Sequence, residues 1–235
     1  MKELKDRIVA GERAAIAKAI TLVESSRDED IQKSHELISQ LIKSPGHATR
    51  VGFSGPPGVG KSTFIESFGT FLLNKNFKLG VLAIDPSSNF TGGSILGDKT
   101  RMSEISKNDN TFIRSTPSRG SLGGIAMGTR EAAIILDAAG YDYIFIETVG
   151  VGQSEITAAN LVDIFTLIVG PGSGDELQGI KKGITEYADL FIVNKNDGDL
   201  APQASKTASD YKSALSFYNK ESNTLDTQVV LVSSV

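Results

Sequence analysis

Short apolar runs alternate with amphipathic stretches along most of the chain. Runs of Val, Ile, Leu and Phe that end in Gly, Ser, Asn or Asp are typical of strands buried on both faces. They predict strands over residues 50–54, 80–85, 111–114, 142–147, 163–169, 190–194 and 228–232. Apolar residues at helical spacing predict helices over residues 61–75, 125–138 and 203–219. This alternation predicts an α/β fold, with a mostly parallel sheet flanked by helices.

The first part of the chain has helical periodicity and no strand pattern. Apolar residues recur at helical spacing over residues 6–24 and again over residues 30–43, and a Ser-Pro-Gly break follows at 44–46. We expect a small N-terminal helical hairpin within residues 1–45. It either packs on the rest of the chain or docks a partner protein, and the sequence leaves both readings open.

Composition narrows the class of protein. Of the 235 residues, 40% are hydrophobic, enough for a packed core, and the net charge of −4 gives no general attraction to nucleic acid or to an anionic membrane. No apolar run approaches the roughly 20 residues of a membrane-spanning helix, and the N-terminus lacks a hydrophobic signal core. A cytoplasmic location is expected. The chain has no cysteine, and His35 and His47 are its only imidazoles.

Residues 55–62, the phosphate loop, match the pattern GxxxxGK[ST] between a predicted strand and a predicted helix. Glycines let successive backbone N–H groups converge on phosphate oxygens, and the helix N-terminus adds partial positive charge. Lys61 is expected to reach the β- and γ-phosphates, and the Ser62 hydroxyl to bind Mg²⁺. The residues expected to contact nucleotide are Gly55, Pro56, Pro57, Gly58, Val59, Gly60, Lys61, Ser62 and Thr63. Residues 46–235 are therefore predicted to form a P-loop NTPase domain.

Two acidic residues lie around a long glycine-rich loop after the second predicted strand. Asp85 ends that strand, and Asp98 lies near the end of the loop over residues 89–101. Long loops without regular structure are usually functional, and this one suits a switch that orders around a γ-phosphate and its metal. We expect Asp85 and Asp98 to be Mg²⁺ ligands. The alternatives, a turn cap for Asp85 and a surface acid for Asp98, stay open.

The strand over residues 142–147 ends in Glu147 and is followed by a glycine-rich loop. The Glu147 carboxylate is suited to hold the Mg²⁺ shell or to orient water. Gly150 lets the backbone approach the γ-phosphate, and Gln153 is suited to position the attacking water. The expected catalytic residues are Lys61, Glu147 and Gln153.

Residues 194–197, the base loop, read Asn-Lys-Asn-Asp and match NKxD at the end of an apolar strand. The carboxylate of Asp197 is able to accept both N1–H and N2–H of guanine, a donor pair that adenine lacks, so adenine would leave it desolvated and unpaired. Lys195 is expected to lie along the base, and Asn194 to join this loop to the phosphate loop. The pattern favours guanine.

A further glycine-spaced, charged segment occupies residues 171–182, after the strand over residues 163–169. It is either a solvated connection or a third mobile segment that contacts nucleotide or partner. Arg101, Arg114 and Arg119 lie in or near loops at the expected ligand edge, and nothing identifies any of them as an arginine finger.

These motifs closely resemble those of the MeaB/ArgK family of P-loop GTPases, whose human member is the MMAA protein. The resemblance covers nearly everything from Gly11 to Val232. Its most specific stretches are DPSS at 85–88, TGGSILGDKTRM at 91–102, ETVGVGQSE at 147–155, GDELQGIKKG at 174–183 and NKNDGD at 194–199.

The resemblance implies a GTPase that acts as a chaperone for methylmalonyl-CoA mutase or a related acyl-CoA mutase, with Mg²⁺ as its metal, GTP as substrate and GDP as product. GTP binding and hydrolysis would gate adenosylcobalamin delivery and protect the mutase from inactivation. Cobalamin would then belong to the partner enzyme. Residues 171–182 match the family's additional switch segment, which communicates with the mutase.

The chain departs from the family at its end. The family continues into a Ser-Ala motif beside the base and then into C-terminal helices that help form a homodimer. Here Ser233 and Ser234 mark the start of a base-side loop, with Ser233 expected to contact the nucleotide, and the sequence ends at Val235. The resemblance therefore does not carry homodimerisation over to this chain, which is expected to be a fragment.

Three other functions compete with this interpretation. An older family description, a kinase associated with lysine/arginine/ornithine transport, is the main alternative. Nickel-delivery GTPases share the architecture but usually use histidine or cysteine clusters. A nucleotide-dependent scaffold without catalysis is the third.

Overall fold

A computed structural model describes residues 1–44, 46–85, 102–117, 122–148, 154–173, 184, 187–218 and 227–234. Within these ranges seven strands form one sheet. The strands are β1 (Thr49–Ser54), β2 (Leu79–Asp85), β3 (Thr111–Pro117), β4 (Tyr143–Thr148), β5 (Ile164–Val169), β6 (Leu190–Val193) and β7 (Gln228–Leu231). Each lies where an apolar run predicted it, with small differences at the ends.

The strand order places β1 at the centre of the sheet. The order is β3-β2-β4-β1-β5-β6-β7, and all neighbouring strands pair in parallel. In an open parallel sheet the carboxyl ends of the strands point the same way. The carboxyl ends of β1, β4 and β6 therefore lie at one edge, which carries the phosphate loop, Glu147 and the base loop.

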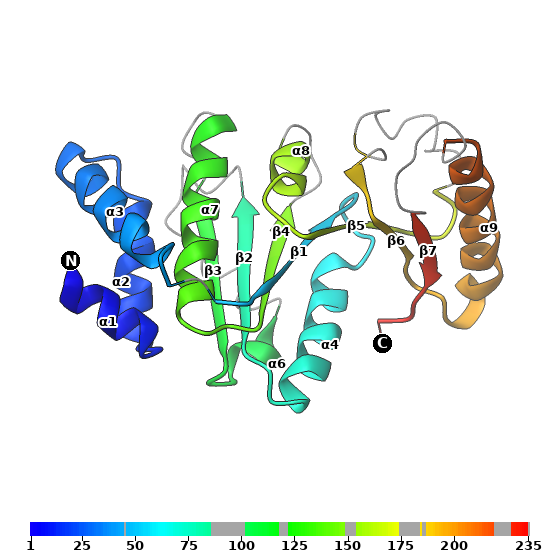
Figure 1. The fold of residues 1–235 in the computed structure, drawn as a ribbon. Helices are drawn as coiled ribbons and strands as arrows, with labels where there is room; N and C mark the ends of the chain where they lie inside the picture. Colours follow the sequence, from blue (N-terminus) through cyan, green and yellow to red (C-terminus); the bar gives the residue numbers. More distant parts are fainter. Residues whose placement is uncertain are drawn as a thin grey trace.

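Helices cover both faces of the sheet (Figure 1). On one face lie α4 (Lys61–Asn74) and α6 (Ser103–Ser106); on the other lie α7 (Leu122–Ala138), α8 (Ser154–Ala159) and α9 (Ala201–Tyr218). Alternate residues of one strand enter two separate cores. Phe145 belongs to the core of α4, whereas Ile144 and Ile146 belong to that of α7. Burial on both faces explains why these strands read as continuous apolar runs.

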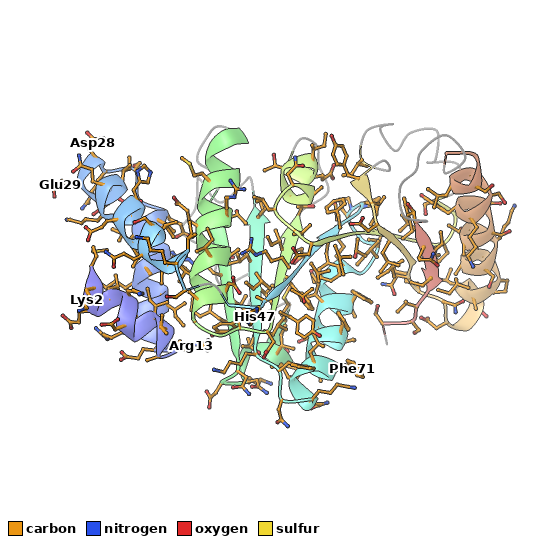
Figure 2. All side chains as sticks on the ribbon, in the orientation of Figure 1. Lys2, Arg13, Asp28, Glu29, His47 and Phe71 are labelled. Atoms are coloured by element: carbon orange, nitrogen blue, oxygen red, sulfur yellow. The ribbon has the colours of Figure 1, made fainter. Side chains whose placement is uncertain are left out.

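Aromatic packing fixes α4 on the sheet. The Phe68 ring stacks on Phe145 with centroids 5.6 Å apart, and Phe64 lies 5.7 Å from Phe53 of β1. Aromatic pairs of this kind stabilise the fold beyond what the burial of their apolar surface contributes. On the outer side of α4, Phe71 (labelled in Figure 2) is 53% exposed. Because α4 begins directly after the phosphate loop, this packing also fixes where that loop ends.

The N-terminal segment contains three helices where a two-helix hairpin was predicted: α1 (Lys2–Val9), α2 (Arg13–Val23) and α3 (Asp28–Leu41). Prediction of a single helix over residues 6–24 was wrong because Gly11 ends α1. Its φ is +77°, the Gly11 N–H donates to Ile8 O, and the Glu12 N–H donates to Arg7 O. This is a Schellman C-cap, a feature that glycine accommodates without strain.

The three helices pack against α7 at one end of the molecule (Figure 1). Ile16, Ile20 and Leu37 are fully buried in the same core as Ala132 and Leu136 of α7. The packing interpretation of the segment is therefore confirmed, and partner docking stays a prediction. None of the helices within the described ranges is long and apolar enough to cross a membrane.

Arginines join α2 to the edge strand β3. Arg13, labelled in Figure 2, donates to the Thr111 carbonyl oxygen at 2.6 Å. Arg114 of β3 forms an ion pair with Glu24, whose side chain is 8% exposed, and Arg114 Nη2 also donates to Thr21 Oγ1 at 3.3 Å. Arg114 is thus engaged with the N-terminal helices, while Arg101 and Arg119 lie outside the described residues.

The Arg114–Glu24 pair is expected to stabilise the fold measurably. We expect Arg114→Ala or Glu24→Ala to lower the free energy of unfolding by about 1–2 kcal/mol, because each change leaves a charge partly buried without this partner. The double variant should lose less than the sum of the singles. Urea unfolding measures all three. Glu104→Ala, which removes an exposed pair with Lys107, is the control and should cost less than about 0.5 kcal/mol. Additive losses would contradict a direct coupling.

Candidate functional site

The phosphate loop connects β1 to α4 at the centre of the carboxyl edge. Two of its glycines are required by geometry. A Cβ on Gly55 (φ +142°) would lie 2.0 Å from the Ile168 carbonyl oxygen of β5, and Gly60 (φ +93°) starts α4 in the left-handed region. The loop is therefore pressed against the sheet, with the N-terminus of α4 directly behind it.

Lys61 lies inside this loop. The residue is buried, with 8% of its surface exposed. Its Nζ donates to Gly55 O at 2.7 Å and to Pro56 O at 3.0 Å. The ammonium group thus lies at the first turn of the loop, beside the amino-terminal end of α4. Both the ammonium and the helix N-terminus favour anions.

Ser62 and Glu147 come together from neighbouring elements. Ser62 Oγ donates to Glu147 Oε1 at 3.1 Å, and Glu147 is 9% exposed at the end of β4. Hard oxygen donors of this kind suit Mg²⁺, which keeps several waters and takes one or two carboxylates with phosphate oxygens. The described residues contain no cluster of three acidic, histidine or cysteine ligands. The Ser62 hydroxyl and the Glu147 carboxylate are oxygen ligands of the kind that Mg²⁺ takes.

Part of the predicted metal and catalytic set is not described. Asp85 ends β2, the neighbour of β4, which places its backbone at the same edge as Glu147. The side chain of Asp85, together with Asp98, Gly150 and Gln153, lies outside the described residues. These positions stay predictions.

The base loop contacts the phosphate loop through two side chains. Asn194, 1% exposed, donates from Nδ2 to the Val59 carbonyl oxygen at 3.0 Å. Lys195 Nζ donates to the Gly58 carbonyl oxygen at 2.7 Å. Lys195 has a positive φ of 58°, uncommon for a residue with a side chain. The loops after β1 and β6 are thereby held at a fixed separation.

Asp197, the last residue of the base loop, contacts the segment after β7. Ser233 Oγ donates to Asp197 Oδ2 at 2.8 Å, and the Asn196 N–H donates to Val232 O at 3.0 Å. Asp197 precedes the short 3-10 helix η3 (Gly198–Leu200). Its carboxylate is therefore positioned by backbone and side-chain contacts from two loops.

A hollow of about 560 Å³ adjoins the phosphate loop. It lies between residues 56–59 of that loop and residues 170–173 after β5, with Lys195 and Gln203 also on its wall. The Gly172 N–H donates to Thr207 Oγ1 of α9 at 3.0 Å. The first residues of the predicted segment 171–182 are thus anchored on α9, and residues 174–182 lie outside the description.

Several hydroxyl contacts at the site were not predicted from the sequence. Thr148 Oγ1 donates to Ser54 Oγ at 2.9 Å, and both side chains are fully buried where β4 and β1 meet their loops. Ser67 of α4 donates to Ser234 O at 2.8 Å. Serine and threonine occur throughout the chain, so only the strand order could have singled these residues out.

A family model and several known proteins match most of this chain. The model of the family described as methylmalonyl Co-A mutase-associated GTPase MeaB matches residues 16–235. A protein of Caulobacter vibrioides named as a GTPase is 55% identical, over 90% of this chain and 65% of its own length. The mouse methylmalonic aciduria type A homolog, mitochondrial, is 46% identical, over 97% of this chain and 57% of its own length.

A solved structure agrees in fold as well. The crystal structure of an LAO/AO transport system kinase superposes with a TM-score of 0.81 at 36% identity, covering 99% of this chain and 68% of that one. The Caulobacter and mouse relatives are longer proteins, and this chain spans less than two thirds of the length of each. On the extent of the family match and these identities, the chain belongs to the MeaB family of methylmalonyl Co-A mutase-associated GTPases.

Proposed function

We propose that this chain binds GTP with Mg²⁺ and hydrolyses it to GDP and phosphate. The observation that carries the proposal is the joining of the base loop to the phosphate loop, through Asn194 to Val59 O at 3.0 Å and Lys195 to Gly58 O at 2.7 Å. One molecule that spans both loops must carry a phosphate chain at one end and a base at the other. Guanine nucleotides satisfy both ends.

Base selection rests on Asp197. Its carboxylate would offer two acceptor oxygens to the adjacent N1–H and N2–H donors of guanine, and Lys195 would lie along the base. Ser233 Oγ donates to one of these carboxylate oxygens. Adenine offers an acceptor at N1, which would face a carboxylate. Such a mismatch would leave the Asp197 carboxylate desolvated and unpaired, which costs about 1–3 kcal/mol or more of binding free energy.

Hydrolysis would proceed by positioning and electrostatics. The phosphate-loop amides and Lys61 would stabilise negative charge on the transferring phosphoryl group. Ser62 and Glu147, with Asp85 and Asp98, would hold Mg²⁺, which supplies charge neutralisation at the β- and γ-phosphate oxygens. Glu147 or Gln153 would orient the attacking water, and Gly150 would let the backbone approach the γ-phosphate.

The client we propose is methylmalonyl-CoA mutase or a related cobalamin-dependent acyl-CoA mutase. The description of the matched family supports this partner, as does the mouse relative's name. GTP binding and hydrolysis would gate cobalamin loading and protect the mutase, with cobalamin bound by the mutase alone. In this scheme the segment that begins at residues 171–173 would report the nucleotide state.

A kinase associated with amino-acid transport is the second candidate, and the name of the 36% identical solved structure favours it. A kinase would move the γ-phosphate of ATP to a protein, whereas a GTPase releases it to water. The two candidates therefore differ in both the base used and the fate of the phosphate.

Phosphate release from GTP and from ATP, with and without purified mutase, tests the proposal. We expect slow release from GTP alone, several-fold faster release with the mutase, and none above background from ATP. Radiolabel transferred from ATP to a binding protein would establish the kinase instead. GTP binding without release, even with saturating mutase, would support a non-catalytic scaffold.

A further inference from the structure

A second hollow, of about 870 Å³, lies among the three N-terminal helices. Its wall is built by residues of α1, α2 and α3, at the end of the molecule where these helices pack on α7 (Figure 1). Within the described part of the chain, this hollow shares no wall residue with the one beside the phosphate loop. Pockets that hold small molecules usually measure about 300–1,000 Å³, so this hollow is large enough for one.

The wall of the hollow is partly apolar. On α2, Lys18, Thr21 and Leu22 occur at the i, i+3 and i+4 spacing that places side chains on the same side of a helix, and all three line the hollow. Leu22 and Leu4 of α1 are partly buried residues that pack against the core and also line the hollow. The hollow therefore combines apolar contact surface with charged side chains.

Four cations line the hollow, and two of them have no ionic partner. Arg7 and Lys33 each pair with a carboxylate that is not part of the wall. Lys18 and Arg27, which are exposed, form no ion pair with any residue in the described ranges. Their charged ends are therefore available to an anion from solution.

Three carboxylates also line the hollow, and two of them are engaged. Glu24 forms an ion pair with Arg114 of β3, and Asp30 Oδ2 accepts a hydrogen bond from Ser25 Oγ at 2.6 Å. The third carboxylate is that of Glu3 on α1. Among the described residues, the unengaged charges of the wall are thus two cations and one carboxylate, which favours an anionic ligand.

We propose that this hollow binds a small organic anion, a molecule with a carboxylate or phosphate head and an apolar body. Lys18 and Arg27 hold the head through charge-assisted hydrogen bonds. Leu4 and Leu22 contact the body, whose transfer from water adds affinity whatever the head is. The site goes beyond the proposed function and does not depend on nucleotide binding.

Fluorescence titration with 8-anilinonaphthalene-1-sulfonate, an aromatic anion, tests the site. We expect saturable binding that weakens as salt is added, because salt screens exposed charges. The uncharged analogue N-phenyl-1-naphthylamine, which lacks the sulfonate, should bind at least about fivefold more weakly. Saturating GDP should leave the signal of the bound sulfonate unchanged, since the two hollows have no wall residue in common.

Two charge variants place the probe in this hollow. Lys18→Gln and Arg27→Gln should each raise the dissociation constant of the sulfonate about threefold to fivefold, and the double variant about tenfold or more. Lys206→Gln is the matched control, because it removes an exposed lysine from α9 at the opposite end of the molecule (Figure 1). All four proteins should keep the wild-type melting temperature, so that weaker binding reports the site and not unfolding.

Competition against the bound sulfonate identifies the head of the ligand. Octanoate and octyl phosphate carry the same apolar chain with a carboxylate or a phosphate head. We expect both to displace the probe, and the one that does so at lower concentration carries the preferred head. Displacement by either should weaken in the Lys18→Gln/Arg27→Gln double variant.

Four results would overturn this site. They are equal affinity for the charged and uncharged probes, wild-type affinity in the double variant, displacement of the probe by GDP, and displacement by a poly-glutamate peptide but by neither octyl compound. The last would assign the hollow to an acidic polypeptide. A chain that binds no guanine nucleotide would overturn the proposed function and leave this inference standing.

Discussion

Lys61→Ala is expected to lower the rate of GTP hydrolysis by about 100-fold or more. The Lys61 ammonium lies inside the phosphate loop, 2.7 Å from Gly55 O, where it is able to reach developing charge on the phosphates. Removal of one such stabilising donor typically costs 10²–10³-fold in rate. Single-turnover phosphate release from prebound GTP measures the loss. Because the same group also contacts the ground-state phosphates, GTP affinity should fall as well.

Lys75→Ala is the matched control for this variant. It removes the same charge just after α4, where Lys75 lies over the Phe71 ring at 4.8 Å, on the exposed side of the helix. Its hydrolysis rate should equal that of the wild type. Lys61→Ala with a wild-type rate would contradict the catalytic role of the phosphate loop.

Asp197→Asn is expected to change the preferred base from guanine to xanthine. The carboxylate loses one acceptor, so two charge-assisted hydrogen bonds to guanine become one neutral one, and GTP affinity should fall by about 100-fold. Xanthine carries a carbonyl oxygen where guanine carries its 2-amino group, and the new Nδ2 is able to donate to it. Competition of GTP and XTP for the same site, measured with both forms of the protein, gives the change in preference.

Asp199→Asn controls for the charge change two residues away, on the exposed η3 turn. It should leave the order of GTP and XTP as in the wild type. The role assigned to Asp197 would be contradicted if the Asp197→Asn protein kept its GTP affinity, or lost both nucleotides equally.

The sheet was predictable because its strands are buried on both faces. Such strands appear as uninterrupted apolar runs, and β4 shows why: Phe145 enters one core while Ile144 and Ile146 enter the other. Strand order was not predictable in the same way. The position of β1 between β4 and β5 depends on long-range pairing that no local pattern records.

The N-terminal segment shows the limits of periodicity. The helical spacing of Ile16 and Ile20 correctly predicted a helix at α2, but the predicted helix continued across Gly11. Glycine inside a helical pattern is either tolerated or a C-cap. The backbone hydrogen bonds from Gly11 and Glu12 to the preceding turn show that Gly11 is part of a C-cap. These hydrogen bonds are known only from the structure.

Local motifs in the sequence propose candidate site residues, but they do not give the contacts that these residues make with distant elements. The motif pattern was enough to propose Lys61, Asn194, Lys195 and Asp197 as site residues, and their roles stay predictions. The partners of these side chains come from distant elements: Ser62 contacts Glu147, and Asn194 contacts Ser234. Such pairs follow from the strand order, so they could not be read from spacing alone.

The central claim is that this chain holds a guanine nucleotide between the phosphate loop and the base loop. Its most direct test is the ratio of dissociation constants for ADP and GDP, measured for the wild-type chain by calorimetry in Mg²⁺ buffer. A site built to pair with guanine donors predicts that GDP binds at least about 100-fold more tightly than ADP. Equal constants, or tighter binding of ADP, would contradict the claim.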